Sequence, residues 1–189
     1  MSLEERISWN ERFRTGDHAA SKPDPFLLSL SQYTPLYPKG RRALDVACGA
    51  GRHTVWLAQN GWSATGLDIA LEGLRRARSL AIQNAVSVDL ACLDLDELSL
   101  PECQFDLIIC FFYLQRKLFP ILRSALRPGG LVVYKTYTSD QCQFPGRPQH
   151  PLHLLRPQEL LEEFRGFRVL IYQEVVKEKG VAQILAQKV

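Results

Sequence analysis

After its N-terminal segment the chain alternates between short apolar runs and stretches with apolar residues at helical spacing. The runs have the length and composition of buried parallel strands, and this alternation predicts an α/β domain. The predicted strands of the alternating part are 42–48, 63–67, 86–92, 105–113 and 131–136. Two further β-rich segments, 168–175 and 181–189, predict an antiparallel pair at the end. We expect a three-layer α/β fold with a seven-stranded, mainly parallel sheet.

The length and composition of the chain exclude several classes of protein. The 189 residues, 46% of them apolar, are enough for one domain with its own core. No apolar run approaches the ~20 residues of a membrane span. The early charges of Glu4, Glu5 and Arg6 do not fit a secretory signal. The net charge of +3 makes a nucleic-acid partner unlikely on electrostatic grounds and favours a small-molecule partner.

The five cysteines are odd in number and contain no Cys-x-x-Cys pair. This is not the pattern of a disulfide framework or a zinc site. Reduced cysteine acts as a small hydrophobe, so we expect free thiols, a cytoplasmic location and no metal. His150 and His153, in a proline-rich stretch, favour a surface or loop-bracing role over a metal site.

Residues 44–53, LDVACGAGRH, combine the end of a strand, a glycine-containing turn and the start of a helix. Gly49 and Gly51 let the backbone turn sharply and let a ligand approach the main chain. The helix N-terminus then offers unpaired N–H groups in the crevice where open α/β sheets bind ligands. A simple tight turn gives the same pattern, so the motif needs support from elsewhere in the chain.

Three acidic residues give that support. Asp68 ends the second strand, nineteen residues after Gly49, where a carboxylate can accept hydrogen bonds from a ribose diol. Asp94 follows the third strand and either frames an adenine ring or caps a helix. Asp45 lies in a buried run, where an unpaired carboxylate costs several kcal/mol. We expect it to brace the glycine turn or to face a cationic ligand.

Two cofactor classes fit these features to different degrees. The nicotinamide pattern G-x-G-x-x-G needs a third glycine where Thr54 stands, and no glycine run is present to face a diphosphate. S-adenosylmethionine needs a ribose acid, an adenine slot and polar groups for its methionine end, all of which the chain offers. We expect S-adenosylmethionine as cofactor. A nicotinamide-dependent reductase and a non-catalytic cofactor-binding module remain alternatives.

The chain resembles the class I S-adenosylmethionine-dependent methyltransferases over roughly residues 9–175. The motifs that carry the resemblance are LDVACGAGRH, TGLDIA, CLDLDEL, FDLIICFFYL and LRPGGLVVYKTY, in this order. More narrowly, WNERF, the C-G-x-G-R turn and HLLRPQELLEEF are similar to small bacterial methyltransferases of the tellurite-resistance-protein type. The resemblance implies a Rossmann-like fold with an antiparallel seventh strand inserted between strands five and six.

The resemblance also implies a set of cofactor-binding residues. Ala47 replaces the usual first glycine, Asp68 is the ribose acid, and Asp94 is the acid beside the adenine. The predicted cofactor-binding residues are Asp45, Ala47, Cys48, Gly49, Gly51, Arg52, Asp68, Ile69, Asp94, Leu95, Cys110 and Phe111. The product of the cofactor would be S-adenosylhomocysteine.

The acceptor is constrained mainly by what the sequence lacks. The end of strand four, Cys110 to Tyr113, has no Asn/Asp-Pro-Pro-aromatic run, which disfavours a nucleic-acid amine as acceptor. Its rings either favour the sulfonium weakly or are ordinary core aromatics. The candidate substrate residues are Trp9, Phe13, Tyr113, Tyr137, Arg147, His153 and Arg156. Arg156 is equally consistent with capping its own loop, while the other loop cations would suit an anionic small substrate.

We therefore expect methyl transfer to a small molecule by in-line displacement, with an RNA or protein methyltransferase as an alternative. Alignment supplies most of the catalysis, and a base is needed only if the acceptor must lose a proton, so no catalytic residue is predicted. We expect a single domain, as monomer or homodimer. Its expected parts are an N-terminal helical cap (1–40), a cofactor-binding core (41–136), a substrate-side loop (137–157), and a helix with the strand pair (158–189).

Overall fold

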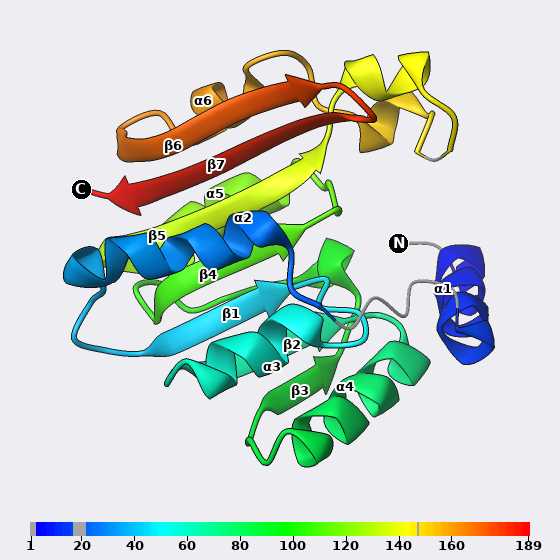
Figure 1. The fold of residues 1–189 in the computed structure, drawn as a ribbon, viewed down its shortest axis with the longest axis horizontal. Coiled ribbons are helices and arrows are strands. Elements are labelled where there is room, and N and C mark those ends of the chain that lie inside the picture. The colour runs from blue at the N-terminus through cyan, green and yellow to red at the C-terminus, as the bar shows by residue number, and fades with distance from the viewer. Residues whose placement is uncertain (1–2, 17–21, 147) are drawn as a thin grey trace.

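A seven-stranded sheet with helices on both faces forms the body of the protein (Figure 1). The computed structural model describes residues 3–16, 22–146 and 148–189. The strands are β1 (Arg42–Val46), β2 (Ser63–Asp68), β3 (Asp89–Cys92), β4 (Phe105–Phe111), β5 (Leu126–Tyr137), β6 (Phe167–Val176) and β7 (Gly180–Lys188). Every residue of β4 is buried, which explains its continuous apolar sequence at the centre of the sheet.

The strand order is β3-β2-β1-β4-β5-β7-β6. The pairs from β3 to β5 are parallel, and β7 pairs antiparallel with both β5 and β6. The predicted fold class is therefore confirmed, including the antiparallel seventh strand between strands five and six. Because β7 runs against β5, its first residues lie beside the last residues of β5, with Tyr137 opposite Val181.

Helices cover the two faces of the sheet unequally. The α-helices are α1 (Leu3–Thr15), α2 (Pro25–Leu28), α3 (Arg52–Gln59), α4 (Leu71–Gln83), α5 (Leu118–Ala125) and α6 (Glu159–Glu163). The 3₁₀ helices are η1 (Ser29–Leu36), η2 (Leu95–Glu97), η3 (Ser139–Gln143) and η4 (Pro151–His153). Buried side chains of α5 and α6 share one core with the sheet, and those of α2, η1 and α3 share the other. Helix α1 stands beyond the ends of the strands (Figure 1).

The fifth strand begins earlier than the sequence pattern indicates. The run Pro128-Gly129-Gly130 predicts a break before a strand at 131, yet β5 starts at Leu126. Its pairing with β4 shifts register across this run, and Gly129 has a φ of 78°. Glycine tolerates such a kink, so the chain bulges within the strand instead of leaving the sheet. Within the described residues, no helix has the length and apolar character to cross a membrane.

Candidate active site

The carboxyl ends of the parallel strands meet at one edge of the sheet, on the right in Figure 1. The predicted cofactor residues gather at this edge, on the turn after β1, at Asp68 of β2, at Asp94 after β3 and at Cys110 near the end of β4. Helix α1 lies beyond the same edge (Figure 1). The topology thus brings together residues that the sequence spreads over about a third of the chain.

The turn after β1 depends on unusual backbone geometry. Ala47, Gly49 and Gly51 have φ values of 58°, 55° and 78°. A side chain at Gly51 would also place its Cβ 2.5 Å from the Cβ of Ala77 in α4. Glycine is therefore required at this position both by conformation and by the close approach of α4. Ala47 adopts the left-handed region without being glycine, a form of strain that clusters at ligand sites.

The carboxylate of Asp68 holds the glycine turn against the start of α4. It accepts hydrogen bonds from the Gly49 N–H and the Ala70 N–H, each at 2.8 Å. Burial raises the pKa of Asp68, and the backbone hydrogen bonds oppose that rise. The two carboxylate oxygens have four acceptor positions in all, so the carboxylate can still accept a hydroxyl beside its backbone hydrogen bonds. This donor and acceptor set fits the ribose diol of S-adenosylmethionine.

Asp45 braces the turn from inside the sheet. Its carboxylate is 1% exposed and accepts a 2.6 Å hydrogen bond from the Thr54 hydroxyl of α3. Burial raises the pKa of Asp45 to about 7, with the Thr54 hydrogen bond acting against the rise. Thr54 is fully buried, and the missing Cβ of Gly66 leaves room for its hydroxyl. Thr54 therefore replaces the third glycine of the nicotinamide pattern because it holds a buried acid.

The predicted adenine residues lie where the sequence places them. The Asp94 carboxylate accepts from the Asp96 N–H at 2.9 Å and caps η2, which is the capping alternative of the sequence analysis. Leu95 and Ile69 are buried beside this strand end.

Arg52 is the first residue of α3, next to the glycine turn. Among the described residues its guanidinium has no hydrogen bond or ion pair, while its charge acts on Asp45.

Three of the predicted cofactor residues are packed into the core. The Cys48 and Cys110 thiols are buried, and burial raises the pKa of Cys110 to about 12. The Cys110 thiol lies 3.7 Å from the Tyr113 carbonyl oxygen, which is hydrogen-bond range for sulfur. The Phe111 ring packs 4.2 Å from the His53 ring. These side chains shape the floor of the site, and both thiols stay protonated at neutral pH.

Helix α1 covers the glycine turn. The Phe13 ring is 5% exposed, and its edge lies 3.0 Å from the position that a Cβ of Gly49 would take. Trp9 stacks on Phe13 with ring centroids 6.0 Å apart. The Asn10 side-chain oxygen accepts from the Glu72 N–H at the start of α4. Trp9 and Phe13, which the sequence suggests as substrate residues, therefore lie on the cofactor side of the edge.

The other substrate candidates separate into two groups. Tyr137 packs against Phe112, with ring centroids 5.2 Å apart, at the carboxyl ends of β5 and β4. Tyr113 lies nearby, and burial raises its pKa. His153 is exposed, and its ring lies 5.9 Å from that of His150. Only the two tyrosines of this set face the strand ends.

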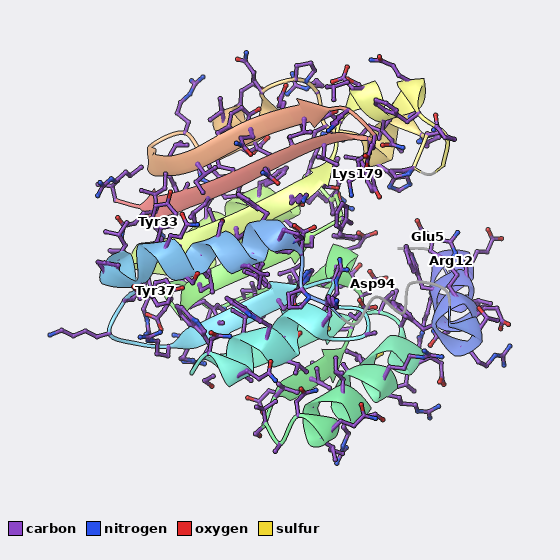
Figure 2. All side chains as sticks on the ribbon, in the orientation of Figure 1. Glu5, Arg12, Tyr33, Tyr37, Asp94 and Lys179 are labelled. Atoms are coloured by element: carbon purple, nitrogen blue, oxygen red, sulfur yellow. The ribbon has the colours of Figure 1, made fainter. Side chains whose placement is uncertain are left out.

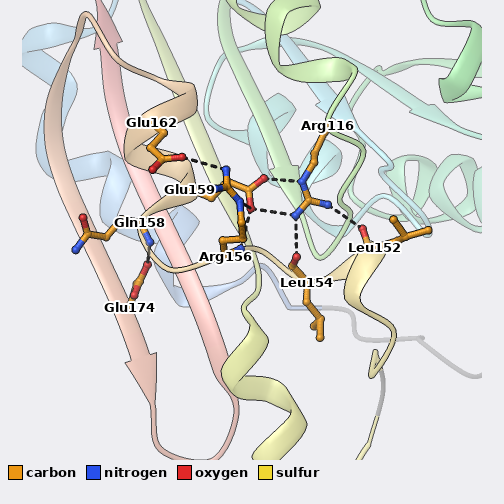
Figure 3. Close-up of polar contacts among 8 residues, drawn as sticks. All are labelled: Arg116, Leu152, Leu154, Arg156, Gln158, Glu159, Glu162 and Glu174. Carbon is orange, nitrogen blue, oxygen red and sulfur yellow. Dashed lines mark hydrogen bonds and ion pairs between the residues drawn. The ribbon is translucent and has the colours of Figure 1, made fainter.

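Of the two arginine candidates, the structure describes only Arg156. Arg147 lies outside the described residues. Arg156 forms ion pairs with Glu159 and Glu162, at 3.5 Å and 3.1 Å (Figure 3). This arrangement supports the loop-capping alternative for Arg156, since its charge is already compensated.

Sequence reasoning missed Arg116, which fixes the loop that carries these candidates. Its guanidinium donates to both carboxylate oxygens of Glu159, at 2.6 Å and 3.0 Å, and to the carbonyl oxygens of Leu152 and Leu154 (Figure 3). Glu159 is 1% exposed, so its carboxylate depends on these donors. The available signal was an arginine five residues after the buried strand β4.

A buried ion pair was also missed. The Lys135 ammonium of β5 donates to both oxygens of Asp24, at 2.8 Å and 3.1 Å. The His53 Nε2 accepts from the Asp24 N–H at 3.1 Å, and burial lowers the pKa of His53 to about 3. A lysine inside the apolar run VVYKTY was the available signal. This network anchors the segment before α2 to the centre of the sheet.

The described part of the chain contains no preformed metal site. No group of three or more His, Cys, Asp and Glu side chains there is close enough to hold an ion. All five cysteines are free thiols.

Comparison with known proteins assigns the core. Residues 43–130 match the family described as "Methyltransferase domain". A ubiquinone biosynthesis O-methyltransferase of Bordetella avium is 31% identical over 112 residues, which are 56% of this chain and 46% of that protein. The enzyme of the same name from Bordetella bronchiseptica is 30% identical over 127 residues, 64% of this chain and 53% of that protein. The chain spans about half the length of the curated relatives it matches.

Solved structures share the fold. TehB from Haemophilus influenzae superposes with a TM-score of 0.73 at 16% identity, over 95% of this chain and 67% of that one. An S-adenosylmethionine-dependent methyltransferase from Mesorhizobium loti has a TM-score of 0.67 at 21% identity, over 85% of this chain and 97% of that one. Residues 43–130 of this chain therefore match a methyltransferase-domain family, and the chain shares the fold of these methyltransferase structures.

Proposed function

We propose that the protein transfers a methyl group from S-adenosylmethionine to a small-molecule acceptor by in-line displacement. The observation that carries the proposal is the buried Asp68 carboxylate, which binds the glycine turn and keeps acceptor positions for a ribose diol. The family of residues 43–130 supports it. The names of the Bordetella relatives support a small acceptor that is methylated on oxygen.

When bound, S-adenosylmethionine supplies a methyl group carried on a positively charged sulfur. Loss of this methyl group converts the cofactor to S-adenosylhomocysteine. The residues of this chain would bind and orient the cofactor and the acceptor, and they would exclude water. Asp68 would accept from the ribose, Asp94 and Leu95 would line the adenine, and α1 would cover the turn through Phe13. Alignment of this kind can supply roughly 7–11 kcal/mol of a reaction barrier. No described side chain is needed as a base unless the acceptor must lose a proton.

The alternatives fit less well. A nicotinamide-dependent reductase would need a glycine where Thr54 is buried against Asp45. An RNA or protein acceptor is not favoured by the net charge of +3. We also propose that the chain works in a reducing, cytoplasmic environment, supported by its free thiols. The division into a cap (1–40), core (41–136), loop (137–157) and C-terminal part (158–189) stays part of the proposal.

The test is calorimetric titration of the protein with S-adenosylmethionine, S-adenosylhomocysteine and NADH. We expect binding of the first two and none of NADH at millimolar concentration. Asp68→Ala should weaken binding about 100-fold, because hydrogen bonds to a charged group contribute ~1.5–3 kcal/mol each. Asp89→Ala, an exposed acid at the start of β3, is the matched control and should bind like the wild type.

Thermal unfolding of both variants distinguishes a lost contact from a lost fold. Binding of NADH in place of S-adenosylmethionine, or an unchanged dissociation constant in a folded Asp68→Ala protein, would contradict the proposal.

A further inference from the structure

A phenylalanine at the end of β4 has a backbone conformation that bulky residues rarely adopt. Phe112 has a φ of 59°, and its N–H donates to the Lys135 carbonyl oxygen at 2.7 Å. Non-glycine residues in the left-handed region are strained and cluster at ligand sites. This conformation places the Phe112 ring at the carboxyl ends of β4 and β5. The acceptor of the proposed reaction must reach the cofactor there.

Two further side chains join Phe112 there, and we call Phe112, Tyr137 and Lys179 the strand-end cluster. The Tyr137 ring lies 5.2 Å from the Phe112 ring at an angle of 45°. The Lys179 ammonium lies 5.1 Å from the centre of the Phe112 ring. Lys179 reaches this place because the turn between β6 and β7 returns the chain to the end of β5. Figure 2 shows Lys179 at the same edge of the molecule as Asp94.

The charges around the cluster are unequally compensated. Lys135 also approaches the Phe112 ring, at 5.8 Å, but its ammonium is paired with the buried Asp24 carboxylate. Lys179 is exposed, and its ammonium makes no hydrogen bond or ion pair with any described residue.

The guanidinium of Arg52 is a second positive charge, and it makes no hydrogen bond or ion pair with a described residue. Burial raises the pKa of Tyr137, and the Arg52 charge lowers it, so the guanidinium acts on the cluster from the glycine-turn side. The aromatic rings of the cluster therefore lie beside the Lys179 ammonium, which has no acidic partner among the described residues.

We propose that Lys179 is a specificity residue that selects an aromatic acceptor carrying an anionic group, such as a carboxylate on the ring. The acceptor ring would pack on Phe112 and Tyr137, and its anion would pair with the Lys179 ammonium. This inference rests on the proposed function and names the substrate class of the same site. With a phenolic acceptor, a bond forms between the phenolic oxygen and the methyl carbon, the sulfur–methyl bond breaks with its electron pair left on sulfur, and the phenolic proton passes to solvent.

The experiment compares an anionic with a neutral acceptor of the same shape. Binding of 3,4-dihydroxybenzoate and 3,4-dihydroxybenzamide is measured by titration into the complex with S-adenosylhomocysteine, for the wild type, Lys179→Gln and Lys177→Gln. Lys177 is an exposed lysine of the same turn without a ring contact and is the matched control. We expect the wild type to prefer the benzoate about tenfold.

Lys179→Gln should reduce benzoate affinity about three- to fivefold, the range of an exposed ion pair, and leave benzamide affinity within a factor of ~1.5. Lys177→Gln should change neither, and salt at 0.5 M should weaken only the benzoate preference. A benzoate preference that Lys179→Gln leaves unchanged would overturn the inference. Equal or absent binding of both acceptors to a complex that holds S-adenosylhomocysteine would also overturn it and leave the proposed function standing. Failure of S-adenosylhomocysteine itself to bind would instead overturn the proposed function.

Discussion

The sheet edge at the carboxyl ends of the parallel strands has two halves, and different interactions hold them. The glycine-turn half, residues 45–54 with Asp68, is held by contacts between residues nine and nineteen positions apart in the chain. The far half, at the ends of β4 and β5, is held by the buried ion pair Lys135–Asp24 and by the partly exposed ion pair Arg116–Glu159. These join residues 111 and 43 positions apart.

This difference shows which interactions determine the structure of each half. In the glycine-turn half, backbone N–H groups and one hydroxyl satisfy two buried carboxylates, and positive φ values set the path of the chain. In the far half, opposite charges from distant segments satisfy one another. Removing one member of a buried ion pair leaves an uncompensated charge, which costs more than losing one neutral donor. The far half is therefore the more sensitive to single substitutions.

The largest expected effect is at Asp24. Asp24→Ala should lower the free energy of unfolding by about 3–5 kcal/mol, because the Lys135 ammonium is left buried without its partner. Urea unfolding followed by circular dichroism measures this loss. The control is Glu11→Ala, which removes an exposed ion pair with Arg14 and should cost less than ~1 kcal/mol. A loss at Asp24 no greater than that at Glu11 would remove the distinction between the two halves.

A smaller effect is expected at Thr54. Thr54→Val keeps the shape of the side chain but leaves the buried Asp45 carboxylate without its hydroxyl donor. The expected loss is about 1–3 kcal/mol, less than for Asp24→Ala. The matched control is Thr65→Val on β2, a half-buried threonine that should change stability by less than ~0.5 kcal/mol. Equal losses at Thr54 and Asp24 would show that both halves resist substitution alike.

The smallest effect is the pH dependence from Asp45. Its pKa is about 7 in the folded protein and 3.8 without the fold. Between these values the folded state binds more protons than the unfolded state, so the contribution of Asp45 to stability is full below pH 4 and is lost as pH rises through 7. Asp45→Asn removes this titration and keeps an oxygen for Thr54. The stability of Asp45→Asn relative to the wild type should therefore rise from pH 5 to pH 8.

Denaturant titrations of the two proteins at both pH values measure that difference. The low pKa of His53, about 3, changes stability in the opposite direction over its own range. It is present in both proteins and cancels in the comparison. A relative stability that stays flat between pH 5 and pH 8 would contradict an elevated pKa at Asp45.

The sequence predicted the fold and one half of the edge. The alternation of runs predicted the seven strands, and the family resemblance predicted the antiparallel β7 between β5 and β6, both of which the structure confirms. The glycine turn and Asp68 could be found because strand, turn and acid lie close together in the chain. The start of β5 was missed because Pro128-Gly129-Gly130 has the composition of a turn, whereas β4 pairs with β5 both before this run, at Leu126, and after it, at Leu131.

What the sequence by itself determined is local: which segments are strands, where the chain must turn with positive φ, and which acid follows the turn at the right spacing. Only the tertiary structure decided that Lys135 meets Asp24, that Arg116 holds Glu159, and that Lys179 approaches Phe112. The physical reason is that these pairs have no spacing rule. Each pair forms because the fold brings distant segments together. A buried charge then pairs with the nearest opposite charge, and an aromatic ring contacts the nearest cation.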